Sequence, residues 1–205
     1  MKEPKIIIKY NRFLDPIFIG YIKSLPQWKD WQVPSSEEVL RRIEEYKKEW
    51  KKNEKIILNA LCEITDLEFF RNVIDVYIVS GNPRQFSNPI VIKSGFEPLE
   101  FVITLTHELV HKLFSDNNKI VPELLSLFPK ETPTTANHVV IHAILKYLYL
   151  DVLNNEKLFQ KNITMSKGHS TNDYQRAWII VEEKGYKNII KTFKEIYKKS
   201  PPSLL

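Results

Sequence analysis

The chain has 205 residues and a single cysteine, Cys62, so intramolecular disulfides and metal sites that need several thiolates are excluded. Its composition, 43% hydrophobic and 27% charged, is typical of a globular chain, and we expect a single domain over residues 1–205. The net charge is +5, but 24 of the 30 basic residues are lysines and many alternate with glutamate. That pattern is typical of a solvated helix face, so we do not expect a nucleic-acid partner.

The first half of the chain carries both strand and helix signals. We predict these elements in chain order: a strand over 4–10, a helix over 13–24, a long helix from about residue 36 that continues or restarts through 56–64, and strands over 73–80 and 89–93. Ser35 and Glu38 have the spacing of a capping box at the start of the long helix. The last two strands are expected to form a hairpin or to lie as neighbours.

The second half is predicted to be mostly helical. In chain order we expect a helix over 97–114, a helical turn at 124–128, a helix over 136–153, a loop over 161–172, and helices over 173–183 and 188–199. These elements together predict an α+β fold with a small mixed sheet. The apolar run at the N-terminus is too short for a signal peptide, and no segment approaches the roughly 18 apolar residues of a membrane span. We therefore expect a cytoplasmic location and no membrane partner.

Two histidines four residues apart interrupt the apolar helix predicted over 97–114. His107 and His111 fall on one face of that helix, one turn apart, so their imidazoles can reach a single ion. Glu108 follows the first histidine, and its carboxylate can take a proton from a metal-activated water and pass it to a leaving amine. The pattern predicts a zinc site that hydrolyses an amide.

A catalytic zinc usually has three protein ligands and one open position, so a third ligand must come from elsewhere. His138 and His142 repeat the same spacing on the next apolar helix. Between His111 and His138 lie 26 residues, enough for a turn and a return helix. Other candidates for the third ligand remain open: Glu123, Glu131 and His169.

The segment from His107 to His111, preceded by two strands, resembles the zincin metallopeptidases. The arrangement is most similar to the gluzincins and their small single-domain relatives, and the resemblance covers about residues 73–150. In that family an edge strand just before the active-site helix binds the substrate backbone by strand addition. The resemblance implies that residues 89–93 form this strand.

The third zinc ligand of the gluzincins is a glutamate one helix later, often after an asparagine. An acidic residue four positions further on holds the first histidine. Asn137 matches the asparagine, and a histidine replaces the glutamate at position 138. The resemblance therefore implies that His138 is the third ligand and that His142 supports a ligand, with His142 as an alternative ligand.

These observations predict a zinc-dependent metallopeptidase that acts on a peptide or protein. The expected site residues are Glu108 as general base, His107, His111 and His138 as ligands of Zn²⁺, and His169 and Tyr174 as substrate-binding or oxyanion groups.

The alternative is a catalytically latent module of the same fold that binds metal and serves protein or nucleic-acid interaction. It is favoured if both His138 and His142 are ligands, because zinc would then have four protein ligands and no open position.

Overall fold

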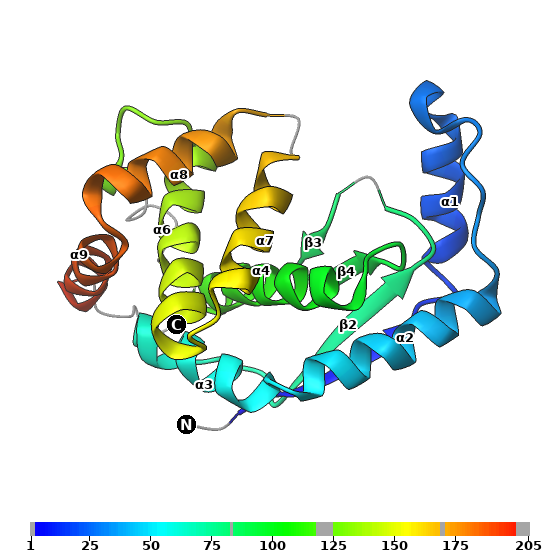
Figure 1. Ribbon diagram of the computed structural model, residues 1–205, viewed down its shortest axis with the longest axis horizontal. Helices are drawn as coiled ribbons and strands as arrows, with labels where there is room; N and C mark the ends of the chain where they lie inside the picture. The colour runs from blue at the N-terminus through cyan, green and yellow to red at the C-terminus, as the bar shows by residue number, and fades with distance from the viewer. Residues whose placement is uncertain (1–2, 83, 118–124, 169–170, 200–205) are drawn as a thin grey trace. The chain divides into compact units, whose positions relative to one another are not determined.

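The computed structural model describes residues 3–82, 84–117, 125–168 and 171–199, which fold as two compact units (Figure 1). We call residues 2–55 and 70–112 the sheet unit, and residues 56–69 and 113–205 the helical unit. The sheet and the many helices confirm the expected mixture of α and β structure. The expectation of a single domain over the whole chain stays a prediction.

Four strands form a mixed sheet in the order β1-β2-β4-β3. Their bounds are Lys5–Tyr10 for β1, Val73–Val79 for β2, Phe86–Ser87 for β3 and Ile90–Lys93 for β4. β1, β2 and β4 are parallel, whereas β3 is antiparallel to β4. The three predicted strands are therefore confirmed, and the last two are neighbours rather than a hairpin. β3 lies between them in the chain, and its two residues are too few to give a sequence signal.

The two faces of the sheet differ in polarity because side chains alternate along each strand. On one face Ile6 and Ile8 of β1 lie in register with Ile74 and Val76 of β2, and all four are buried. On the other face Lys9 forms an ion pair with Asp75, with Nζ and Oδ1 2.8 Å apart. The apolar face carries the core of the sheet unit.

Helix α2, Ser36–Lys51, packs against β1 and β2. Ser35 caps it as predicted, since its Oγ accepts the backbone N–H of Glu38 at 3.2 Å. Near its middle the ring of Tyr46 stacks on Phe101 of α4 (Pro98–Asp116), with centroids 4.2 Å apart. The Tyr46 hydroxyl also donates to the carbonyl of Phe96, at 2.7 Å. These contacts fix the start of α4 within the sheet unit.

Helix α1, Asp15–Ser24, is followed by a short 3-10 turn, Pro26–Trp28 (η1). Asp15 is 3% exposed, and its carboxylate accepts the backbone N–H of Ser80 at 2.6 Å and the Ser80 hydroxyl at 2.7 Å. Tyr10 donates to the same carboxylate. Three donors offset the cost of burying this charge, and they tie the start of α1 to the ends of β1 and β2.

The helical unit is built around α6, which packs against α8 and α9 (Figure 1). Its elements are α3 (Glu54–Thr65, from Ile56 on), α6 Pro133–Tyr147, the π-helix η2 Leu148–Val152, α7 Glu156–Lys167, α8 Asp173–Lys184 and α9 Tyr186–Lys199. The last turn of α4, from Leu113, also belongs to this unit. Within the described ranges no helix has the length and apolar run needed to cross a membrane.

One prediction for this half of the chain was wrong. The expected loop over 161–172 is helical as far as Lys167, because α7 begins at Glu156. Its buried face includes Asn162 and Ser166, so the apolar period that identifies a helix is weak there. The expected helix over 136–153 is confirmed: α6 runs to Tyr147, and the chain stays helical through the π-helix η2 to Val152.

Candidate metal centre

Helix α4 begins where the sequence predicts it. Pro98 is its first residue, and the Glu100 carboxylate accepts the backbone N–H of Glu97 at 3.1 Å, which satisfies a donor at the helix start. Further along, the helix is buried on nearly all sides by apolar residues: Phe101, Val102, Ile103, Leu105, Leu109, Val110 and Leu113. Polar groups in the middle of such a helix are costly unless they have partners.

His107 and His111 lie on one face of α4 and are both partly exposed. Their Nε2 atoms are 3.1 Å apart and their ring centroids 4.9 Å apart. Two nitrogens on one tetrahedral zinc are about 3.3 Å apart, given Zn–N bonds of about 2.0–2.1 Å. The pair therefore fits a shared ion, and the same distance fits a hydrogen bond between the two imidazoles.

Glu108 differs from its two histidine neighbours in being almost completely buried, with 7% of its surface exposed. Burial raises the pKa of its carboxyl group to about 8, because the charged form loses its hydration. A divalent cation nearby would act in the opposite direction and favour the carboxylate. The charge state of Glu108 therefore depends on whether the histidines hold a metal.

The second histidine pair lies in the helical unit, on α6. Thr132 caps this helix, since its Oγ1 accepts the backbone N–H of Thr135 at 3.0 Å. One turn further, His138 Nδ1 lies 2.7 Å from the carbonyl oxygen of Thr134. A carbonyl only accepts, so Nδ1 carries the proton and Nε2 keeps the lone pair that a metal requires. A ligand histidine commonly makes this contact through its other nitrogen.

Aromatic rings from α8 cover both histidines of α6. Tyr174 packs on His138 with ring centroids 4.1 Å apart. Trp178, one turn along α8, stacks almost parallel on the fully buried His142, at 4.3 Å. The predicted residue Tyr174 therefore lies beside His138, and its role as an oxyanion group stays a prediction.

The start of α8 is tied to the start of α6. The Asp173 carboxylate accepts the hydroxyl of Thr135 at 2.8 Å and the hydroxyl of Thr132. Hydrogen bonds from Thr132 and Thr135 lower the pKa of Asp173. Asp173 therefore supports the helix start that carries His138.

The remaining sequence candidates fall into two groups. Glu131 forms a two-pronged ion pair with Arg176, with the closest nitrogen and oxygen 2.7 Å apart. Whether Glu131 is a third ligand stays a prediction. Glu123 and His169 lie outside the described residues.

The strand at 89–93 was expected to be an open edge for substrate. In the sheet β4 lies between β2 and β3, and Ser87 and Phe86 pair with Ile90 and Val91. The backbone N–H of Lys93 donates to the Gln85 side chain at 3.2 Å. The expectation was wrong because β3 takes the edge position.

His107, Glu108 and His111 belong to the sheet unit, whereas His138, His142 and Tyr174 belong to the helical unit. Comparisons with protein-family models, with curated proteins and with solved structures gave no match. The zincin family therefore stays an expectation, and the function has to be argued from the chain's own residues.

Three residues around the second histidine pair were not predicted. The Thr134 carbonyl gives no sequence signal, because any residue has one. Trp178 follows Tyr174 by four residues, which places both rings on one face of α8, and that spacing was a usable signal. The sequence identifies Asp173 as an acidic residue typical of a first helical turn, but it does not predict the contacts of Asp173 with α6.

Proposed function

We propose that this chain is a zinc-dependent metallopeptidase in which Glu108 is the general base. The observation that supports it most directly is the 3.1 Å separation of His107 Nε2 and His111 Nε2 on α4. Glu108, which lies between the two histidines in the sequence, is buried. Two imidazoles and one adjacent carboxylate are the residue types that metal-assisted amide hydrolysis needs.

His138 is the proposed third ligand. Its Nδ1–H is held by Thr134, which leaves Nε2 for a metal. His142 is proposed to support the site, since it is fully buried against Trp178. Three histidines would leave a fourth position open, as catalysis requires.

Zinc at such a site supplies Lewis acidity, which makes a water molecule acidic near neutral pH. With such an ion bound, the Glu108 carboxylate would serve as the general base that takes up the proton of the attacking water and passes it to the nitrogen of the leaving amine. The buried position of Glu108 keeps bulk water away from its carboxylate, so the proton stays within the site. The proposed substrate is a peptide or protein.

The test compares zinc content and peptide cleavage in the wild type and in Glu108→Gln, with the exposed Glu183→Gln as control. We expect Glu108→Gln to keep its zinc and to lose cleavage by about a hundredfold or more. Equal cleavage by both variants, or purified wild type without zinc, would refute the peptidase proposal.

A second candidate is the latent metal-binding module, and the presence of a second histidine pair on α6 favours it. If His138 and His142 both bind the ion, four protein ligands close the site. Zinc-loaded wild type that cleaves no peptide, with four nitrogen ligands by X-ray absorption spectroscopy, is the result that selects this candidate.

A further inference from the structure

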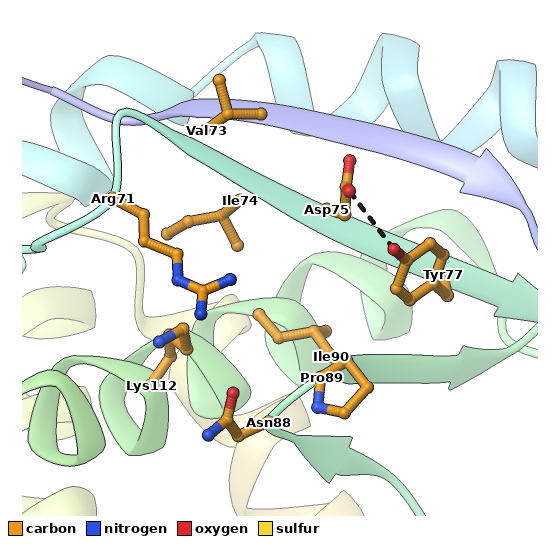
Figure 2. A pocket seen from close by; sticks show the side chains of 9 residues that line it. All are labelled: Arg71, Val73, Ile74, Asp75, Tyr77, Asn88, Pro89, Ile90 and Lys112. Carbon is orange, nitrogen blue, oxygen red and sulfur yellow. Dashed lines mark hydrogen bonds between the residues drawn. The ribbon is translucent and has the colours of Figure 1, made fainter.

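Two surface features of the sheet unit have no part in the proposed function. The first is a pocket of about 300 Å³ at the starts of β2 and β4 (Figure 2). Two of its charged side chains are already engaged, since Asp75 forms an ion pair with Lys9 and Lys112 interacts with another group of the protein. The second feature is the outward face of helix α1, where the exposed side chains indicate a binding partner.

Helix α1 packs on the rest of the sheet unit through one of its faces, and Figure 1 shows it at the periphery of that unit. Asp15 and Ile22 on the packed face are only 3% and 5% exposed. Between them Phe18 lies against Phe86 of β3, with ring centroids 5.9 Å apart. The helical turn begins before Asp15, whose backbone N–H donates to the carbonyl of Asn11 at 3.1 Å. At 3.6 residues per turn, the positions opposite these packed residues face outward.

Large apolar side chains occupy this outward face. Phe13, Ile17 and Tyr21 follow one another at intervals of four residues, and they are 84%, 61% and 52% exposed. They form a row about 12 Å long, at a rise of 1.5 Å per residue. The exposed ring of Trp28 follows in the turn η1. The outer face of a surface helix normally carries polar residues, so a contiguous apolar row there indicates an interaction site.

The charged side chains of the same segment are mostly basic. Arg12, Lys23 and Lys29 are exposed. Of the two acids in residues 11–30, Asp15 is buried and hydrogen-bonded, and only Asp30 is exposed. The surface around the apolar row therefore has an excess of positive charge. The complementary partner is apolar where it meets the row and negatively charged beside it.

We propose that the outward face of α1 binds the surface of an anionic lipid bilayer. Phenylalanine, tyrosine and tryptophan rings favour the headgroup region of a bilayer, and lysine and arginine are attracted to anionic lipids. A fluid bilayer accepts a protruding row of side chains, whereas a folded protein partner would need a matching groove. The expectation of no membrane partner came from the lack of a spanning segment, and a helix that lies on the surface does not span the bilayer.

The proposal is independent of the peptidase proposal, so its experiment reads neither zinc nor cleavage. The full chain is floated through a density gradient with vesicles of phosphatidylcholine, alone or mixed with phosphatidylserine. We expect it to float with the phosphatidylserine vesicles, and less so at high salt, because salt screens the attraction between the basic side chains and the lipid. Absence of flotation with these vesicles, or flotation that salt does not weaken, would overturn the proposal.

A variant in the apolar row locates the binding. Phe13→Ser should weaken binding to phosphatidylserine vesicles by about fivefold or more, because one ring no longer enters the bilayer. Since Phe13 is 84% exposed, the variant should fold normally, and circular dichroism checks this. The control Phe70→Ser changes a phenylalanine outside α1 that is 72% exposed, and it should bind as the wild type does. Equal binding by Phe13→Ser and the wild type would contradict the assignment to α1.

A second variant tests the charge. Lys23→Gln should weaken binding to phosphatidylserine vesicles by about fivefold, whereas the exposed Lys55→Gln, away from α1 in the sequence, should not. Sedimentation velocity separates a lipid partner from a second copy of the chain. If the wild type self-associates, Phe13→Ser does not, and neither floats with vesicles, a second copy covers α1 and the lipid proposal is wrong.

Discussion

His138 donates its Nδ1–H to the backbone carbonyl of Thr134, one turn earlier on α6, at 2.7 Å. The helix backbone therefore favours the imidazole tautomer with the proton on Nδ1. His142, one turn later, has its ring stacked on Trp178 instead. Two histidines with the same spacing as His107 and His111 are thus held in different ways, and substitution should distinguish them.

His138→Ala is expected to lower zinc affinity by at least about tenfold, because a ligand is removed. His142→Phe keeps a flat ring against Trp178 and should lower zinc affinity much less. Competition with a chromophoric chelator measures both affinities. The ligand assignment is wrong if His142→Phe loses zinc while His138→Ala retains it.

The contribution of Glu108 to the stability of the metal-free protein should fall as the pH rises from about 4.5 to about 8. Burial raises the pKa of Glu108 from 4.5 to about 8, so the folded chain keeps a proton that the unfolded chain releases. This contribution is fully present below the unfolded pKa and is lost as the pH approaches 8, at about 1.4 kcal/mol per unit of pKa difference.

Glu108→Gln removes that titration and should be more stable than the wild type near pH 8 in the presence of a chelator. Thermal melts of both proteins are compared across this pH range. The contributions of all other titratable groups cancel in the difference, because the two proteins share those groups. If the melting temperatures of the two proteins change in parallel with pH, Glu108 is not the group that causes the loss of stability.

Asp173→Asn should destabilise the helical unit at neutral pH. The wild-type carboxylate accepts hydrogen bonds from Thr132 and Thr135, and these lower its pKa below the ordinary 3.8. A lowered pKa gives stability that is present above the unfolded value and is lost as the pH falls through the folded value. The difference in melting temperature between variant and wild type should therefore shrink in acid. The exposed Asp30→Asn serves as the control and should show no such difference.

Gly81 and Gly20 should respond to alanine in opposite directions. A Cβ at Gly81 would lie 2.6 Å from Trp31 Cη2 and 2.7 Å from Ile22 Cδ1. Gly81→Ala should therefore lower the free energy of unfolding by about 1–3 kcal/mol. Gly20 lies within α1 with nothing inside 4 Å of its Cβ position, so Gly20→Ala should stabilise by about 1 kcal/mol. Urea unfolding of both variants tests the pair, and equal midpoints would contradict the packing around Gly81.

Local patterns predicted most elements because they are properties of neighbouring residues. The run of β-branched residues in β2 and the Ser35 cap of α2 are both readable from a few positions. The π-helix η2 and the short strand β3 were missed, because the first depends on hydrogen-bond register and the second on pairing with β4. Pairing partners are distant in sequence, so a parallel neighbour could not be told from a hairpin.

For the candidate site, the spacing of His107 and His111 was sufficient to place them on one face of α4. The burial of Glu108 could be anticipated from its apolar neighbours, but the size of its pKa shift could not, since it depends on how completely water is excluded. Arg71 and Lys112 are 41 positions apart in the sequence, and only the fold places them around one pocket.

The edges of the sheet have a consequence for the behaviour of the protein at high concentration. One edge strand, β3, is two residues long, and the other, β1, carries the exposed lysines Lys5 and Lys9. Unpaired strand edges are templates for aggregation, and short or lysine-bearing edges resist it. Neither edge of the sheet formed by the described strands is therefore both long and uncharged. We expect the sheet unit to resist pairing of its edge strands with a second chain.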